Sequence, residues 1–264
     1  MKTFKFKTGF VLVLLILLPS FSLSAMPEFT LSAGGGVNLV GFFSNYTISA
    51  NETNSDSNEV WMNLDQKMRQ FNVGFYLYID STFAILSVDF QKGFNSYNEG
   101  GIISVGTSRV DPAPIEGNGK ETTIGIVLLA KYPVQFRKNF VIYPLAGMSW
   151  RIAIAEKRTP EGGREYNRTD GTTEFNQFGD YELSMWNSWL INIGAGMDLF
   201  LKEPFYLRTE LIYSVRLMTK YEKAALDWLM DTYKISQPKL FASPGMTGLT
   251  HGPELRLALG YRLN

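Results

Sequence analysis

No cysteine occurs in the chain of 264 residues, and His251 is its only histidine. The absence of cysteine excludes a disulfide scaffold and any zinc site built on thiolates. One imidazole cannot supply a multi-histidine metal site within a single chain. We therefore expect neither a metal nor another cofactor, and a fold that is held together by backbone pairing and side-chain packing.

The chain also lacks an excess of charge of either sign, since 25 Lys and Arg face 25 Asp and Glu. With only 19% charged residues it offers no basic stripe for phosphates, which excludes nucleic acid as a partner. The hydrophobic content of 45% and the aromatic content of 14% are far above those of disordered chains. The sequence therefore predicts a folded protein of one large domain or two small ones.

A long apolar run is missing everywhere except near the N-terminus. There, three lysines within residues 1–7 precede an apolar run over 9–18, which a break at Pro19 and the small residue Ala25 follow. This arrangement is typical of a cleavable signal peptide over residues 1–25. An uncleaved anchor is the alternative, but the run is shorter than the roughly 20 residues of a membrane-spanning helix. We expect residues 26–264 to be exported as one domain.

The remaining chain alternates apolar and polar residues with a period of two, which is typical of strands. The clearest case is the last segment, where Leu255, Leu257, Leu259, Tyr261 and Leu263 share one face. This pattern and its repeats predict eight strands in all. The other segments with the pattern are 28–43, 67–80, 83–94, 120–133, 140–155, 188–200 and 205–217.

Short and long connections alternate strictly between these strands. The short ones lie near 80–82, 134–139 and 202–204, and the long polar ones at 44–62, 95–119, 156–183 and 219–250. A barrel inserted across a membrane has tight periplasmic turns and long external loops in this order. A soluble lipocalin-like barrel with an inward apolar face is the alternative. We expect an all-β fold, an eight-stranded antiparallel up-and-down transmembrane β-barrel with four long external loops and short periplasmic turns, in a bacterial outer membrane.

The apolar face of segment 255–263 resembles the C-terminal signal that the outer-membrane insertion machinery reads. Together with the export signal and the predicted architecture, it makes the mature chain resemble the small outer-membrane β-barrel proteins of Gram-negative-type bacteria, the group of the OmpW, OmpX and OmpA-barrel families. The chain ends in Leu263-Asn264 instead of a terminal aromatic residue. This departure fits a divergent member, such as one from a spirochaete.

The resemblance implies outer-membrane lipids and the insertion machinery as partners. An OmpW-like protein would give limited passage to small solutes, apolar ones included. The competing hypothesis is a surface adhesin or a structural barrel whose external loops bind a host surface ligand. The long loops fit either function.

If the apolar faces contact lipid, the alternation directs the opposite faces into the lumen. This inward face carries charges of both signs at two depths, as buried charges require partners. The charges either plug the lumen or line an ion path. The layer nearer the periplasm contains Lys131, Asp198, Arg208, Glu210 and Arg262, and the outer layer contains Asp89, Arg151, Arg216, Glu254 and Arg256.

Apolar residues share the inward face with these charges. They either line a pocket for an apolar solute, as the resemblance to OmpW would imply, or pack between the charged layers. The residues in question are Ile85, Val127, Leu129, Leu145, Leu190 and Ile212.

His251 is the only histidine that could act as a base, and it precedes Gly252 and Pro253 near the outer start of the last strand. A lipid-modifying hydrolase needs a nucleophile, a base and an orienting acid within reach of one another. Ser243 and Glu254 are close in sequence, but no His-x-Ser element of the lipid A deacylase type occurs. We therefore expect no catalytic residues and no enzymatic activity, with His251 at the rim of the barrel.

Overall fold

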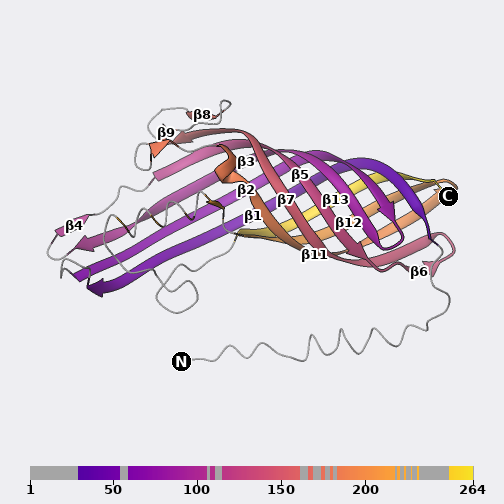
Figure 1. Ribbon diagram of the computed structural model, residues 1–264, viewed down its shortest axis with the longest axis horizontal. Coiled ribbons are helices and arrows are strands. Elements are labelled where there is room, and N and C mark those ends of the chain that lie inside the picture. Colours follow the sequence, from indigo (N-terminus) through magenta and orange to yellow (C-terminus); the bar gives the residue numbers. More distant parts are fainter. Residues whose placement is uncertain are drawn as a thin grey trace, which may run out of the picture.

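The computed structural model is built almost entirely from β-strands (Figure 1). Eight long strands form its body, and short strands and a 3-10 helix lie in the connections between them. The long strands are β1 (Leu31–Thr53), β2 (Glu59–Ser81), β3 (Ala84–Val105), β5 (Ile115–Lys131), β7 (Phe140–Pro160), β11 (Ser188–Lys202), β12 (Phe205–Arg216) and β13 (Thr250–Arg262). The short elements are β4 (Ser108–Val110), β6 (Val134–Arg137), β8 (Tyr166–Arg168), β9 (Glu174–Phe175), β10 (Gly179–Asp180) and η2 (Leu183–Trp186).

The structure describes most of the chain beyond its first residues. The described residues are 29–53, 59–105, 108–110, 115–160, 166–168, 174–175, 179–180, 183–217, 219–220, 223, 227, 231 and 250–263. The predicted signal peptide over 1–25 lies outside them. Among these residues, no helix is long and apolar enough to cross a membrane.

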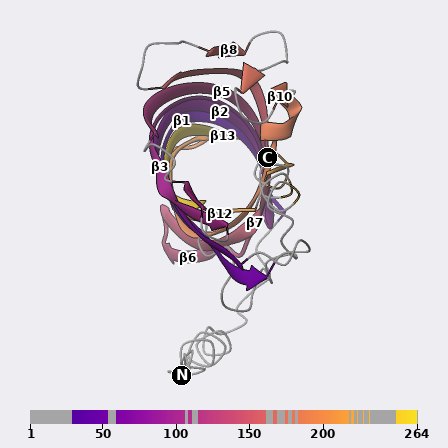
Figure 2. The same ribbon diagram turned by 90° about the vertical axis from the view of Figure 1, so that its left-hand side faces the viewer.

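Antiparallel pairing closes the eight long strands into a barrel. Each strand pairs with the next long strand along the chain, β7 pairs with β11, and β13 pairs back with β1. Viewed from one end, the strands form a ring (Figure 2). The predicted fold class is therefore confirmed. A closed sheet satisfies its backbone hydrogen bonds without water, as a bilayer requires.

The two ends of the barrel differ. At the short-turn end the connections are 82–83, 132–139 and 203–204, and the second of them carries β6. At the opposite end β1, β2, β3, β5 and β7 run on past the ring as a projecting ribbon (Figure 1). Pairing of β1 with β13 stops at Phe43 and His251, whereas pairing of β1 with β2 continues to Thr53 and Glu59. We call this the ribbon end.

Strands reach further at the ribbon end than the sequence predicts. Residues 44–53, 59–62, 95–105 and 115–119 belong to strands, so the predicted boundaries of the loops 44–62 and 95–119 are wrong. The reason is that a strand outside the lipid needs no apolar outward face, so the pattern that marks a membrane strand fades there. Much of the other two predicted long loops lies outside the described residues.

Burial alternates along the strands and agrees with the inside and outside faces predicted from the sequence. In β13, Glu254, Arg256 and Ala258 are buried, whereas Leu255 and Leu257 are exposed. The other long strands also expose large apolar side chains on the outside of the ring. A soluble lipocalin-like barrel would bury such residues, and a lipid-facing barrel exposes them.

The outward face of β2 shows where the lipid-facing surface ends. Every second residue from Phe71 to Ile79 is apolar and exposed, while Arg69 and Lys67 beyond them are exposed and charged. These apolar positions cover about 26 Å of strand at about 3.3 Å per residue. With a strand tilt of about 40°, their height is roughly 20 Å, close to the roughly 25 Å apolar band of membrane barrels. The apolar outer face of β2 therefore ends between Phe71 and Arg69.

Candidate functional site: the ionic lumen

An ionic cluster fills the lumen toward the short-turn end. Arg208 of β12 donates hydrogen bonds from Nε and Nη2 to the two carboxylate oxygens of Asp198, each at 2.8 Å. The same Nη2 contacts the carboxylate of Asp80, which also accepts a hydrogen bond from Lys131 Nζ at 2.7 Å. Two cations thus balance two carboxylates, the condition under which buried charges are tolerated. We call these four residues the Arg208 cluster.

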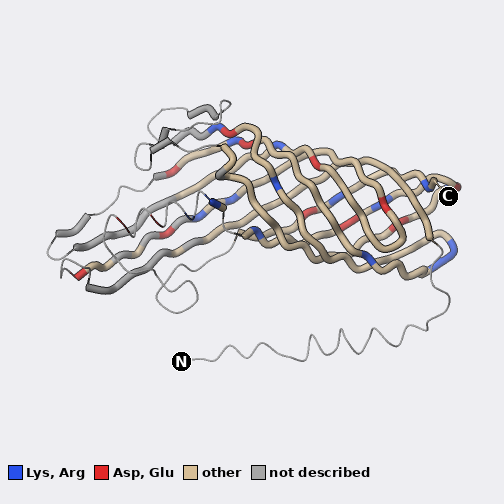
Figure 3. The backbone as a smooth tube through the Cα atoms, in the orientation of Figure 1, with Lys and Arg blue, Asp and Glu red and all other residues tan. Residues whose placement is uncertain are grey.

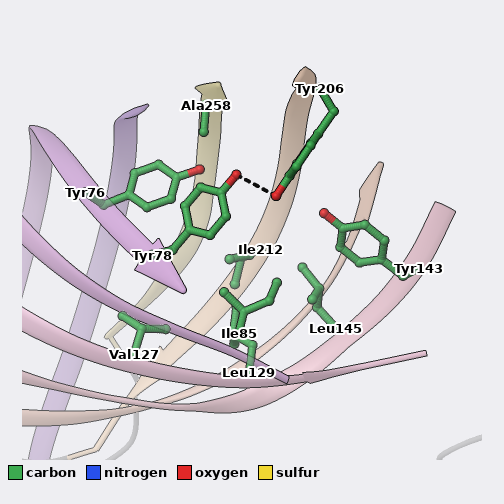
Figure 4. Packing of buried hydrophobic residues seen from close by; sticks show 10 residues of the cluster. All are labelled: Tyr76, Tyr78, Ile85, Val127, Leu129, Tyr143, Leu145, Tyr206, Ile212 and Ala258. Atoms are coloured by element: carbon green, nitrogen blue, oxygen red, sulfur yellow. Dashed lines mark hydrogen bonds between the residues drawn. The ribbon is translucent and has the colours of Figure 1, made fainter. Parts of the chain in front are cut away.

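Three tyrosine rings enclose the guanidinium of Arg208. Its central carbon lies 4.6 Å from the ring centroid of Tyr78, 5.3 Å from that of Tyr206 and 5.6 Å from that of Tyr143. These distances are within the range of cation–π attraction. Tyr143 donates a hydrogen bond to Asp198 at 3.0 Å, and Tyr78 donates one to the Tyr206 hydroxyl at 3.0 Å (Figure 4). The rings therefore add both packing and hydrogen bonds to the ion pairs.

Inward glycines make room for these rings. A Cβ atom added at Gly196 of β11 would overlap the ring of Tyr143. One added at Gly260 of β13 would overlap the ring of Tyr206. The glycines are thus required by the close approach of aromatic side chains in a narrow lumen.

A second ionic cluster lies nearer the ribbon end. Arg256 of β13 donates hydrogen bonds from Nη2 to Asp89 at 2.8 Å and from Nε to Glu254 at 2.7 Å. The other oxygen of Glu254 lies 3.6 Å from Nη2 of Arg151. We call these four residues the Arg256 cluster, which again contains two cations and two carboxylates. Figure 3 shows charges of both signs distributed along the barrel.

All eight long strands supply a member of the two clusters or a hydrogen bond to one. Seven of them supply the charged residues of the clusters. The eighth strand, β1, contributes Asn38, whose amide donates a hydrogen bond to Glu254 at 3.2 Å. Hydrogen bonds and ion pairs therefore cross the lumen and connect strands that are not neighbours in the sheet.

Apolar side chains pack in the lumen beside the charges. Leu190 belongs to one small group, in which it contacts Val40 and Phe42. The other five predicted inward apolar residues belong to a single larger cluster that includes the tyrosines (Figure 4). Between 0% and 2% of each of these side chains is exposed: Ile85, Val127, Leu129, Leu145 and Ile212.

Glu210 is buried without a hydrogen bond in the described part of the structure. It lies directly across from Arg256 on β13 and two residues from Arg208 on its own strand. Its Oε1 is 3.8 Å from Nε of Arg208, and neither carboxylate oxygen has a hydrogen-bond partner. Because both clusters are already balanced, Glu210 is a surplus negative charge.

The two remaining predicted lumen residues lie outside both clusters. Arg216, at the ribbon-side end of β12, donates a hydrogen bond to Thr250 at 3.2 Å. Arg262 is half-buried at the short-turn end, with its guanidinium carbon 5.5 Å from the ring centroid of Phe200. Arg262 thus reaches the predicted depth but contacts an aromatic ring, and Asp80 completes the ionic cluster instead.

Three inward acidic residues are missing from the sequence prediction. Asp80 lies on the polar face of segment 67–80, so the alternation alone was a sufficient signal for it. Glu121 accepts a hydrogen bond from Gln70 at 2.5 Å. Glu156 is buried because a bulge near Ile154 shifts the alternation of β7 by one residue, and no sequence pattern marks that bulge.

His251 contacts a tyrosine. Its Nδ1 is 2.5 Å from the hydroxyl of Tyr213, and the two rings are stacked with centroids 5.7 Å apart. Ser243, the nucleophile considered above, lies outside the described residues. Within the described residues, no group of three or more His, Cys, Asp and Glu is arranged to hold a metal ion. The described part of the lumen thus contains paired charges and packed apolar groups, which fill the barrel.

No protein-family model matches the chain, and no curated protein matches it either. Among solved structures it is similar to OprG of Pseudomonas aeruginosa, at 11% identity over 89% of this chain and 96% of that chain, with a TM-score of 0.36. It is also similar to the outer-membrane protease OmpT of Escherichia coli, at 9% identity over 92% and 100% of the two chains, with a TM-score of 0.35. Ail of Yersinia pestis matches at 12% identity over 88% and 99%, with a TM-score of 0.29. At such scores these similarities carry no conclusion about function.

Proposed function

We propose that this chain is a bacterial outer-membrane protein that is exported by a cleaved signal peptide over 1–25. The short-turn end then lies in the periplasm and the ribbon end outside the cell. The closed sheet and the apolar outer surface support this location. The exposed apolar residues of β13 support recognition of the last strand by the insertion machinery. N-terminal sequencing of the membrane-extracted protein tests the cleavage, and a new N-terminus near Met26 is expected.

The barrel, in this proposal, is a closed anchor, and the ribbon and external loops bind a partner at the cell surface. The observation that carries the proposal is the filling of the lumen by the Arg208 and Arg256 clusters. Each of Arg208, Arg256, Asp89 and Glu210 is 1% exposed, whereas a water-filled path would leave charges in contact with solvent. The surface-binding function is therefore favoured over a pore.

A shortened ribbon tests this function. Residues 47–65 of the β1–β2 hairpin would be replaced by an Asn-Gly turn, which keeps the register because Tyr46 pairs with Gln66. Bacteria that display either protein would be compared for adherence to an epithelial monolayer and to fibronectin-coated plates. We expect the shortened protein to insert normally and to lose adherence. Equal adherence of both strains would argue against binding through this hairpin.

Limited passage of small solutes, as in an OmpW-like protein, is the second candidate. Glu210, which lies in the lumen, favours this candidate. Its buried carboxylate has no hydrogen bond in the described structure, so the lumen is less well satisfied there than in the two ionic clusters. Planar-bilayer recordings and uptake of small apolar solutes by a deletion strain separate the candidates. A conducting wild-type barrel or a solute-uptake defect would reverse our preference.

We also propose that the chain is not an enzyme. The contact between His251 and Tyr213 supports this, because the phenol of Tyr213 already binds Nδ1 of the chain's only histidine. Incubation of the reconstituted protein with lipid A and with a mixture of peptides, followed by mass spectrometry, tests it. Products that disappear in a His251→Ala variant would contradict the proposal.

A further inference from the structure

A hollow of about 420 Å³ opens on the outer surface of the barrel at the upper limit of the lipid-facing band. Strands β1, β2, β3 and β5 form its floor. Three exposed aromatic residues line it, namely Phe43, Phe71 and Phe94. Arg69, the first charged residue beyond the apolar face of β2, also lines it. The hollow therefore spans the depth at which acyl chains give way to headgroups.

The hollow exists because β1 carries no side chain at Gly41. A Cβ atom added there would meet only the ring of Phe43, at an ordinary contact distance of 4.0 Å. Gly36 and Gly252 differ, because a Cβ atom at either position would overlap a neighbouring strand. Packing within the described residues thus does not require glycine at position 41. The absence of a side chain there leaves an open space between aromatic walls.

Strand register places a mainly polar row directly beyond a mainly aromatic one, with Phe43 opposite Arg69 in the first row and Lys120 in the second. Ser96 of β3 lies between Arg69 of β2 and Asn118 of β5. One pair of residues further down, Phe94 lies between Phe71 and Lys120. Directly opposed residues have Cβ atoms about 4.5 to 5.5 Å apart, so the members of each row are in reach of one ligand.

All of these polar residues are exposed on the outward face, and they present two cations, a hydroxyl and an amide. Arginine binds phosphate through two parallel hydrogen bonds, and a serine or asparagine side chain adds further donors. The rings of Phe43, Phe71 and Phe94 have no charge and suit a hydrocarbon chain. Apart from Phe43 and Lys120, the polar groups lie nearer the tip of the ribbon than the aromatic ones, which is the order of headgroup and chain in a lipid.

We propose that this hollow binds one phosphate-bearing anionic lipid of the outer leaflet, with an acyl chain in the space over Gly41 and the phosphate on Arg69, which Lys120 assists from outside the lining, opposite Phe94. Charge complementarity favours this occupant over a second copy of the chain, which would bring the same cations to the contact. The inference rests on the proposed membrane location, because only a lipid-facing hollow meets lipid.

Native mass spectrometry of the full protein released from nanodiscs tests the site. The probe is dioleoyl phosphatidic acid, and dioleoyl phosphatidylcholine with the same chains is the neutral comparison. We expect wild type to retain phosphatidic acid preferentially. Arg69→Gln should lose this preference by about tenfold, since it removes the bidentate charged contact. Gly41→Leu should weaken retention of both lipids because it fills the space for the chain.

Two matched variants serve as controls. Arg137→Gln removes the same charge at the short-turn end, and Ala195→Leu adds the same side chain to an exposed position on β11. Both should bind lipid like wild type. Equal retention of the two lipids by wild type, or equal losses in controls and test variants, would overturn the proposal. The proposal would also be overturned if wild type formed dimers and Gly41→Leu disrupted these dimers without changing the retention of lipid.

Membrane fractionation separates this inference from the proposed location. A chain recovered in the soluble fraction would contradict both the location and the lipid site. A chain that inserts but shows no preference for phosphatidic acid would contradict only the lipid site.

Discussion

Asp198 and Arg208 lie directly opposite each other on β11 and β12, and two hydrogen bonds of 2.8 Å join the carboxylate to the guanidinium. Such bidentate pairs are among the stronger polar contacts in proteins. The pair also depends on register, because a slip of one residue between the strands would turn one side chain away from the lumen. Strand pairing and lumen chemistry therefore stabilise each other.

Removal of one partner of this pair should be costly. In Asp198→Asn, Arg208 loses its two charge-assisted hydrogen bonds to Asp198 and keeps Asp80 as a contact, with Glu210 3.8 Å away, and Tyr143 loses a charged acceptor. We expect the free energy of unfolding to fall by about 3 to 5 kcal/mol, as for other broken buried ion pairs. Urea titration in detergent, read by heat-modifiable gel mobility, measures this. Asp65→Asn, an exposed change on the ribbon, is the control, and a loss as large as that of Asp198→Asn would refute the prediction.

Glu210→Gln should have a much smaller effect. Neither oxygen of Glu210 accepts a hydrogen bond within the described structure, and both ionic clusters are balanced without it. The substitution removes a surplus charge and keeps the side-chain volume. We expect a change of less than about 1 kcal/mol, below the cost of a broken buried pair. The same titration checks this, and a loss equal to that of Asp198→Asn would show that Glu210 neutralises Arg208 or Arg256.

Leu211 is the next residue on β12 and points outward. A change of charge there should have a much larger effect than the change at Glu210. Its side chain is 60% exposed on the outer surface. Leu211→Lys should oppose insertion by roughly 2 to 4 kcal/mol near the bilayer midplane. Folding yield into lipid vesicles measures this, with Leu211→Met as the matched control. Normal insertion of the lysine variant would mean that this face does not contact lipid.

Gly196→Ala should destabilise the barrel, because the new methyl group overlaps the ring of Tyr143. Overpacking of this kind costs about 1 to 3 kcal/mol. Gly41→Ala adds the same methyl group to the open hollow, where no overlap arises. Thermal unfolding in detergent should therefore separate the two variants. Similar midpoints would show that the tyrosine can move aside.

The alternation of side chains is sufficient to predict the inward residues of strands without a bulge. In β12 and β13 nearly every second residue is apolar, with Thr209 as an exception, so Arg208 and Arg256 are assigned to the lumen without further information. The parts of the strands that form the ribbon are not predicted, because a strand outside a bilayer does not need apolar residues on its outward face. The bulge near Ile154 was missed because a one-residue insertion leaves no mark in the pattern.

The partners of the inward charges could not be predicted from the sequence. Asp80 contacts Arg208 although β2 and β12 are separated by two strands around the ring. Such contacts depend on the depth of each residue, and depth depends on strand register and tilt. The sequence places Arg262 in the same layer, but only the three-dimensional arrangement shows that it contacts Phe200.

The ribbon has a mechanical consequence. The pairing of β1 with β2 continues without a break from Leu31 and Ser81 in the ring to Thr53 and Glu59 at the tip. Because this hairpin lies between β13 and β3, a pull on its tip along the barrel axis would load its backbone hydrogen bonds to both neighbours in parallel, as shear, instead of opening them one by one. If the chain has the proposed location and function, a cell held by this hairpin would transmit drag from flowing liquid into the ring, where the two ionic clusters connect the strands.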